Sequence, residues 1–501
     1  EVDAGAQAWL SAATFSNNFI ISGHGFAEVS GGAPIVASGL SAYTGTNTGG
    51  IGAIRMDGNA VITGNITLEG TAKIMCYGST GTISGSISTT NSTDVLVIGG
   101  GASGTNILLT GTNNVGANAL KDIFVNSGSP SAQGQLVAVG NNTTTGTLGT
   151  GSVILNGDAG SASVRFERLD GYTLASGNTI TSVGTDKSKT AVRLDSIGGF
   201  NQNGVEINLG NGSLLSGTVA GRVGSVANLD GNITAGNISL GTAVTGSTVN
   251  FMTGVNVVNS GNLWLGEQSG FAATGNQTGG SVTAGTHMRI GHWSNATSNY
   301  NISGGTLTIA ANAALATDPS TATAAEVNGG IYIGVDGSGI MSQSGGTVKT
   351  DWVVLDNRGD TTAAVDQYNL SGGTLELRGQ WGISNRNASS EFNFTGGTIK
   401  NIGVGVNARI HGLGTFIIGT GGTGCGLDAI EMLMAGASGV GVGTATFREP
   451  RAVNRIHDEV VRWCERHDVT RVDALTASLR ASEAVIYGRF GFGLAGESTS
   501  I

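Results

Sequence analysis

The feature that most constrains this fold is a Gly-Gly-(Thr/Ser) step that recurs between alternating apolar residues. It appears as NQTGGSVTA, NISGGTLTIA, SQSGGTVKT, NLSGGTLELR and NFTGGTIKN, whose first glycines are Gly279, Gly304, Gly345, Gly372 and Gly396. The intervals between these glycines are 25, 41, 27 and 24 residues, and the long one contains an Ala/Thr-rich insert at 310–326. A period in the twenties indicates a stacked repeat architecture.

A second phrase lies between the Gly-Gly steps, an apolar or aromatic residue followed by β-branched alternation. Its copies are LWLGEQSG, HMRIGHW, IYIGVDGSG, WVVLDNRG and WGISNRN, which begin at Leu263, His287, Ile331, Trp352 and Trp381. Each interval therefore supplies at least two short strands separated by Gly, Asn or Asp turns. Such short strands cannot bury an apolar face alone, so successive coils are expected to stack.

This pattern predicts a parallel β-helix, that is, a β-solenoid, and an all-β fold class. Gly allows positive φ at the corners, and Asn tolerates the same region. The expected inward side chains are Leu307, Ile309, Val348, Leu375, Leu377 and Ile399. A β-sandwich would instead need hairpins at a spacing of roughly 8–12 residues. The longer period favours the solenoid, while periodicity alone leaves the sandwich open.

Composition and charge limit the class of protein further. Of 501 residues, 87 are Gly and 4 are Pro, while 39% are hydrophobic, which is too apolar for a disordered linker and too poor in Pro for collagen. The net charge of −10 argues against a nucleic-acid-binding surface. Cys76, Cys425 and Cys464 are too widely spaced for a zinc pattern, so no metal site is predicted.

No membrane span is predicted, because no apolar run approaches the roughly 20 residues that a spanning helix needs. The sequence starts at Glu1 without the basic and apolar regions of a signal peptide. We therefore expect a signal peptide to have been removed or to lie outside this sequence.

Residues from about 61 to 400 resemble a known class of bacterial repeats. The stretch TLGTGSVILNGDAGSASVRFERLDGYTLASGNTI resembles the autotransporter-associated β-strand repeat, and the SGGTL phrases resemble repeats of PEP-CTERM-type surface proteins. The resemblance implies a secreted right-handed parallel β-helix that is displayed at or near a bacterial cell surface. Carbohydrate or cell-surface components would then be its partners.

Few residues on the predicted solenoid suggest chemistry. His24 in SGHGF resembles the Gly-His-Gly of polygalacturonase-like hydrolases, but no Asp-Asp pair accompanies it. His287 and Arg289 alternate along HMRIGHW, which places them on one strand face as candidate carbohydrate contacts, with a solvated strand face as the alternative. The RGD at 358–360 is common enough by chance to carry little weight. No catalytic residue is predicted.

The composition changes near residue 410. Sixteen of the 24 Lys and Arg precede it, and all eight basic residues after it are Arg. From Phe416, a short apolar strand, a glycine loop, a helix with Leu427, Ile430, Leu433 and Met434, and a second strand in SGVGVGT follow one another. Pro450 then opens a longer helix with Val453, Ile456, Val460 and Cys464 on one face. This order predicts a pair of β/α units.

The phrases GTGG, DAIEMLMAGAS and VGTATFREPRA resemble the C-terminal end of dihydroorotate dehydrogenases, which are flavin enzymes with a (β/α) barrel. The resemblance implies that backbone amides of Gly421, Gly422, Gly443 and Thr444 bind the FMN phosphate. A closed barrel needs eight β/α units and this chain supplies about two, so no catalysis and no resident cofactor are expected.

We therefore expect three regions: a β-solenoid repeat domain at 1–410, a partial (β/α) barrel-like fragment at 411–480, and a tail at 481–501 without assignment. The expected function is that of a secreted or surface-displayed bacterial β-solenoid with a structural or adhesive role. The alternatives are a polysaccharide-binding or polysaccharide-degrading β-helix protein, and an FMN- or phosphate-binding remnant. The fragment itself can be an artefact of gene fusion or a cap on the solenoid end.

Overall fold

The computed structural model describes residues 8–470 with gaps, together with Leu475. The gaps are residues 12, 17, 23–53, 58, 71, 78–79, 101–105, 113–119, 121, 127–134, 144, 158–160, 220–223, 313–326, 356–365, 386–389, 404–409, 413–417, 436 and 438. His24, the RGD at 358–360 and the tail at 481–501 thus lie outside the described residues. Two compact units are present, Glu1–Gly261 and Asn262–Ile501. The domain boundary expected at residue 410 stays a prediction.

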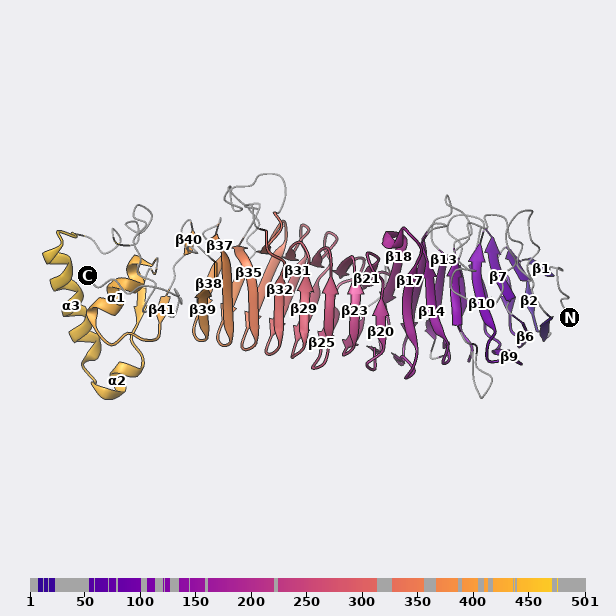
Figure 1. The fold of residues 1–501 in the computed structure, drawn as a ribbon. Coiled ribbons are helices and arrows are strands. Elements are labelled where there is room, and N and C mark those ends of the chain that lie inside the picture. The colour runs from indigo at the N-terminus through magenta and orange to yellow at the C-terminus, as the bar shows by residue number, and fades with distance from the viewer. Residues whose placement is uncertain are drawn as a thin grey trace. The chain divides into compact units, whose positions relative to one another are not determined.

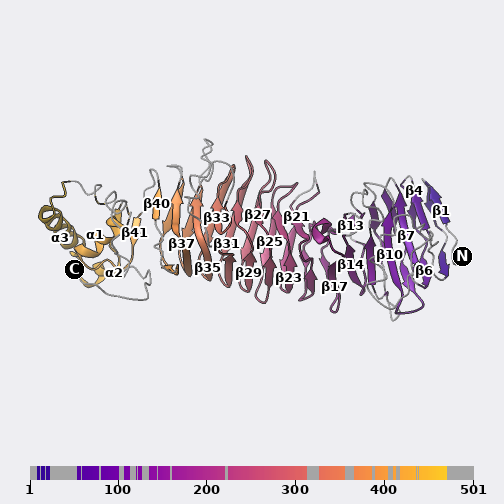
Figure 2. The same cartoon turned by 45° about the horizontal axis from the view of Figure 1, so that its top comes forward.

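The first unit is a parallel β-solenoid, in which each strand pairs with the strand one coil further along (Figures 1 and 2). Ile74, for example, pairs with Ile54 on one side and with Ile98 on the other, and all three side chains are buried. Because every described pairing is parallel, the hairpins of a β-sandwich are absent from the paired strands of this unit.

The described strands of the first unit form four ladders. One ladder joins β1 (Ala8–Ser11), β4 (Ile54–Asp57), β7 (Ala72–Tyr77), β10 (Val95–Gly100), β12 (Asp122–Asn126), β14 (Ser152–Asn156), β17 (Thr179–Val183), β20 (Glu206–Asn208), β23 (Asn232–Ala235) and β26 (Asn256–Asn259). A second joins β2 (Thr14–Phe15), β5 (Val61–Ile62), β8 (Thr80–Ile83), β11 (Asn106–Leu109), β13 (Gln135–Thr143), β15 (Ala162–Arg168), β18 (Thr190–Leu194), β21 (Ser213–Ser216) and β24 (Asn237–Leu240). A third, short ladder joins β3 (Phe19–Ser22), β6 (Ile66–Glu69) and β9 (Ile87–Thr89). A fourth joins β16 (Tyr172–Thr173), β19 (Phe200–Asn201), β22 (Val226–Leu229) and β25 (Ser247–Phe251). A short 3-10 helix covers Lys187–Lys189.

The second unit begins with the same architecture. One ladder joins β27 (Leu263–Leu265), β30 (Met288–Ile290), β33 (Gly330–Ile333), β35 (Thr347–Leu355), β37 (Thr374–Asn385) and β40 (Ile410–Gly412). A second joins β29 (Ser281–Ala284), β32 (Thr306–Ile309), β35, β37 and β39 (Thr398–Asn401). A third joins β28 (Ala273–Gln277), β31 (Thr297–Ile302), β34 (Ser338–Gln343), β36 (Gln367–Leu370) and β38 (Glu391–Phe394).

The predicted core and period are confirmed in this unit. Val282 pairs with Leu307, Leu307 with Val348, Val348 with Leu375, and Leu375 with Ile399. These steps reproduce the 25, 41, 27 and 24-residue intervals of the Gly-Gly repeat. The six expected inward side chains are at most 3% exposed. Complete burial of one aliphatic side chain stabilises the fold by about 1.5–3 kcal/mol, so each coil contributes to a continuous core.

The Gly-Gly step is required at one corner of each coil. The second glycine has a positive φ at every copy, for example 77° at Gly305 and 76° at Gly373. A Cβ atom at the first glycine would collide with a carbonyl oxygen of the preceding coil, as at Gly372 against Ser344. A side chain at the first glycine is thus excluded because there is no room for it. At the second glycine a side chain is disfavoured because the backbone has a positive φ.

Two rows of outward positions carry neutral polar side chains in register, beside charged outward residues such as Lys349, Glu376 and Lys400. The hydroxyl row, on the second ladder, consists of Ser281, Thr306, Thr347, Thr374 and Thr398. The amide row, on the third ladder, consists of Asn276, Asn301, Ser342, Asn369 and Asn393. Within it, the side-chain amides of Asn301 and Asn393 each donate a 2.9 Å hydrogen bond to the Asn of the preceding coil in the row, Asn276 and Asn369 respectively.

The described part of the C-terminal segment contains two β/α units. β41 (Ile418–Thr420) pairs in parallel with β42 (Gly439–Gly441), and three helices follow the strands: α1 (Gly426–Met434), α2 (Thr444–Arg448) and α3 (Ala452–Arg466). Ile430 and Leu433 of α1 are buried as expected, whereas Leu427 is 44% exposed. The expectation that Val453 belongs to the buried face of α3 is wrong, since Val453 is 49% exposed and the helix packs through Ala452, Ile456 and Cys464.

We predict that Gly373→Ala destabilises the protein more than Gly270→Ala. Both glycines have φ near 80°, so both variants incur roughly 1–2 kcal/mol of backbone strain. Only at Gly373 would the new Cβ also collide with backbone, at the Gly346 carbonyl oxygen, whereas the space at Gly270 is open. Overpacking adds about 1–3 kcal/mol. Urea unfolding followed by circular dichroism measures the difference, and equal midpoints for the two variants would contradict it.

Candidate functional site

An aromatic and charged cluster lies on the outward side of the first ladder in the second unit. Leu263, Leu265, Met288 and Ile290 point into the core, so the alternating residues Trp264 and Arg289 point outward from β27 and β30. These two residues are paired in the strand register, and the Arg289 guanidinium lies 5.0 Å from the Trp264 ring centroid. We call the group around them the Trp264 cluster, which consists of Trp264, Glu267, His287, Arg289, His292 and Trp293.

Hydrogen bonds connect the charged members of the Trp264 cluster. Arg289 Nη1 lies 2.5 Å from His292 Nε2, and His292 Nδ1 lies 3.3 Å from a carboxylate oxygen of Glu267. Because a guanidinium only donates, Nε2 must accept, and the proton of a neutral His292 then lies on Nδ1 and points at Glu267. The negative carboxylate of Glu267 and the positive guanidinium of Arg289 are thus connected through the neutral imidazole of His292, and their charges cancel.

The structure brings both predicted carbohydrate contacts against Trp264. His287 is only 6% exposed, accepts a 3.4 Å hydrogen bond from the Trp264 indole, and meets Tyr332 edge-on with ring centroids 6.0 Å apart. Arg289 is partly exposed. Direct contact with a ligand is thus easier for Arg289 than for His287, and carbohydrate binding by either residue stays a prediction.

The exposed member of the cluster was not singled out from the sequence. Trp293 is 45% exposed, and its ring lies 5.2 Å from that of the buried His292, which in turn lies 5.5 Å from the Trp264 ring. The signal available in the sequence was the recurrence of Trp in successive phrases, at 264, 293, 352 and 381. Their contacts depend on the register between coils, which the sequence alone does not supply.

A second group of charges lies on the first unit. Arg165 and Arg193 pair in register between β15 and β18, and Arg165 forms a 3.0 Å ion pair with Glu167. Glu167 and Asp195 are 1% and 6% exposed, and burial raises the pKa of Asp195 although Thr218 donates hydrogen bonds to its carboxylate. These buried carboxylates compensate the charges of Arg165 and Arg193, and they are not accessible to a substrate.

The four predicted phosphate contacts lie on two loops that precede helices. Gly421 and Gly422 have φ values of 95° and 70°, and an added Cβ at either would meet nothing within 4 Å. Gly443 is the N-cap residue of α2, and Thr444 is the first residue of that helix. All four residues are exposed. Open glycine backbone and a threonine hydroxyl fit the chemistry of a phosphate group, and FMN would be held through that group.

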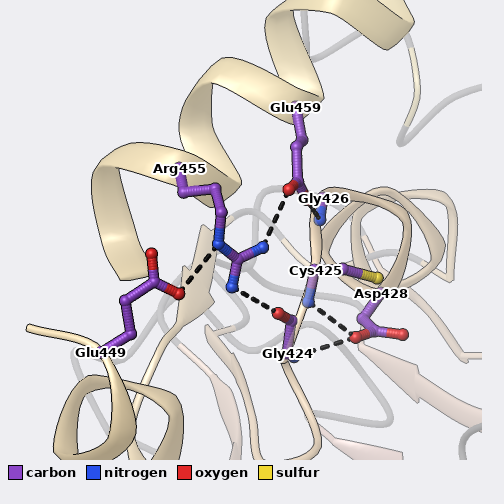
Figure 3. Close-up of polar contacts among 7 residues, drawn as sticks. All are labelled: Gly424, Cys425, Gly426, Asp428, Glu449, Arg455 and Glu459. Atoms are coloured by element: carbon purple, nitrogen blue, oxygen red, sulfur yellow. Dashed lines mark hydrogen bonds and ion pairs between the residues drawn. The ribbon is translucent and has the colours of Figure 1, made fainter. Parts of the chain in front are cut away.

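The helix after the glycine loop already has carboxylates at its N-terminus (Figure 3). Asp428 accepts 2.9 Å hydrogen bonds from the backbone amides of Gly424 and Cys425, and Glu459 of α3 accepts one from Gly426. These carboxylates satisfy amides that an α-helix leaves unpaired at its first turn. On this loop, a phosphate would therefore have to bind at Gly421 and Gly422, ahead of this turn.

Arg455 of α3 links the end of α2 to the glycine loop ahead of α1 (Figure 3). Its guanidinium forms ion pairs with Glu449 at 3.0 Å and Glu459 at 2.8 Å, and donates a 3.0 Å hydrogen bond to the Gly424 carbonyl oxygen. The hydrogen bonds from the Gly426 amide and from Arg455 lower the pKa of Glu459 below its ordinary value of 4.5. Arg455 thus positions the glycine loop through the backbone of Gly424.

Comparison with known proteins finds similarity to dihydroorotate dehydrogenases. The dihydroorotate dehydrogenase family profile matches residues 379–463, which begins within β37 of the solenoid. A putative dihydroorotate dehydrogenase A (fumarate) of Solibacter usitatus is 47% identical over 64 residues, which are 13% of this chain and 21% of that protein.

The catalytic subunit of a dihydroorotate dehydrogenase B (NAD(+)) of Pelobacter propionicus is 46% identical over 63 residues, which are 13% of this chain and 21% of that protein. The chain thus spans about a fifth of the length of these curated relatives. No solved structure matches the chain. The predicted resemblance of the C-terminal segment to dihydroorotate dehydrogenases is confirmed. It concerns this segment and not the chain as a whole.

Within the described residues, no group of three or more His, Cys, Asp or Glu side chains is placed to hold a metal ion. Nor is any helix of this described part long and apolar enough to cross a membrane.

We predict that Glu459→Gln increases hydrogen exchange at Gly424–Gly426 at neutral pH, whereas Glu465→Gln, an exposed site on the same helix, leaves it unchanged. The pKa of Glu459 is lowered by folding, so its contribution is complete above its ordinary pKa of 4.5 and is lost as the pH falls below it. The difference between wild type and Glu459→Gln should therefore vanish in acid. A difference that persists unchanged at low pH, or equal effects of both variants, would contradict this assignment.

Proposed function

We propose that this chain is a secreted or surface-displayed bacterial β-solenoid with a structural and adhesive role. The observation that carries the proposal is the repetition of neutral hydrogen-bonding side chains in register on the outward faces, in the hydroxyl row and the amide row. Such rows present the same donors and acceptors once per coil, at a spacing of about 4.8 Å. A surface that binds weakly at many equivalent places gains strength through multivalency.

The repeat phrases support the extracellular part of this proposal. SGGTL and the GSVILNGDAG stretch are similar to repeats of autotransporter and PEP-CTERM-type surface proteins, in which a β-helix forms the exported body. Neutral Ser, Thr and Asn side chains are also compatible with sugars and cell-wall polymers, whose hydroxyl groups both donate and accept hydrogen bonds. We therefore propose that the protein acts outside the cell or on its surface.

Protease treatment of intact bacteria that produce the chain tests this location. If the solenoid is displayed, trypsin added to intact cells should release peptides from residues 262–403 into the medium, because the protease cannot cross an intact envelope. A cytoplasmic enzyme of the same cells serves as the control and should remain uncut. Release of solenoid peptides only after cell lysis would overturn the proposed location.

A second candidate function, phosphate or FMN binding by the C-terminal segment, is favoured by its 47% identity to a putative dihydroorotate dehydrogenase. Gly421, Gly422, Gly443 and Thr444 would hold the phosphate. The segment supplies about two of the eight β/α units that enclose the cofactor in a complete barrel, so we give this function second place.

We predict that the purified chain shows no flavin absorbance, and that added FMN keeps its full fluorescence and elutes separately on gel filtration. The physical reason is that a phosphate contact at exposed loops, without walls around the flavin ring, buries little of the ligand. Co-elution of FMN with the protein, abolished by Gly443→Val, would instead establish the second candidate function.

A further inference from the structure

We infer that the corner of the solenoid around Trp293 binds a neutral polysaccharide, by stacking a sugar ring on the exposed indole. The inference rests on the adhesive role proposed above and names its ligand class. Trp293 is the one exposed large hydrophobic side chain among the described residues of 262–420, so a stacking surface is present at this corner and not along the whole face.

The indole of Trp293 is supported from behind. The His292 ring lies 5.2 Å from the Trp293 ring and the Trp264 ring follows 5.5 Å from His292, with Arg289 over the far ring at 5.0 Å. His292 is fixed in turn by Arg289 and Glu267. An exposed tryptophan that rests on a buried, hydrogen-bonded partner loses little freedom when a ligand stacks on it, which favours binding.

Neutral polar residues lie on the same turn as Trp293, on the neighbouring turn and on the strand that follows. Trp293 opens the corner turn that ends at Ala296, where a 3.0 Å hydrogen bond joins the Ala296 amide to the Trp293 carbonyl. In the neighbouring turn, the Ser269 hydroxyl donates a 2.9 Å hydrogen bond to the Ser294 carbonyl, and both serines are exposed. The next strand, β31, carries Asn301 of the amide row. Hydroxyl and amide groups can pair with sugar hydroxyls as donors and as acceptors.

The charges of the protein select a neutral polymer. The chain carries a net charge of −10, so a polyanionic glycan would be repelled at long range. At the corner itself, Arg289 is linked to Glu267 through His292, and Asp336, whose backbone amide donates to the His292 carbonyl, adds a second carboxylate, so the corner has no excess of positive charge for an anionic group to pair with. A pyranose ring with an apolar face and uncharged hydroxyls fits both conditions.

Affinity electrophoresis of the purified full chain tests the inference, with hydroxyethylcellulose, galactomannan or laminarin in the native gel and polygalacturonate in a parallel gel. We expect at least one of the neutral polymers to retard the wild type, and Trp293→Ala to weaken that retardation by about tenfold. Trp293→Phe should restore part of it, because an aromatic face returns. Phe447→Ala is the matched control, since it removes an exposed aromatic ring from α2 and should leave retardation unchanged.

Circular dichroism of each variant establishes that the fold is retained. Retardation by none of the neutral polymers, retardation by polygalacturonate alone, or undiminished binding by Trp293→Ala would each overturn the inference. Because this assay uses purified protein, its failure is distinguishable from failure of the proposed surface location, which is read from intact cells.

Discussion

The close approach of successive coils at the Gly-Gly corners is the constraint on which the rest of the solenoid depends. At Gly304, Gly345 and Gly372 the chain passes so near a carbonyl of the preceding coil that no side chain fits. The second glycine then turns the chain with positive φ, and the following strand starts at a fixed place. Since side chains alternate along a strand, a fixed start determines which of them enter the core.

Much of this architecture could be predicted from the sequence because the repeat is nearly regular. Alternation after each Gly-Gly step identified Leu307, Val348, Leu375 and Ile399 as inward, and all four are buried. The third ladder was less predictable, because its inward positions include polar and small residues. Gln277 is an example: it is fully buried and accepts a 2.8 Å hydrogen bond from the buried Tyr300 hydroxyl, so neither hydropathy nor alternation marks it as core.

The candidate sites differ in how far the sequence could locate them. The glycine loops of the C-terminal segment were identified from local phrases, whereas Arg455 and its contact with Gly424 join residues 31 positions apart. In the Trp264 cluster, Glu267 meets His292 only because the coils are stacked in a particular register, 25 residues apart. Without that register, the sequence predicts that His287 and Arg289 share one strand face, but it does not show that both contact Trp264.

The in-register parallel stacking of coils is the central claim, and cysteine cross-linking tests it most directly. Thr374 and Thr398 are paired across β37 and β39 and both point outward, so cysteines at these two positions should be close enough for a disulfide. In a Cys425→Ser background, the Thr374→Cys/Thr398→Cys variant should form an intramolecular disulfide faster than the Thr374→Cys/Lys400→Cys variant, which is displaced by two residues. Equal rates, or faster cross-linking of the displaced pair, would contradict the stacking described here.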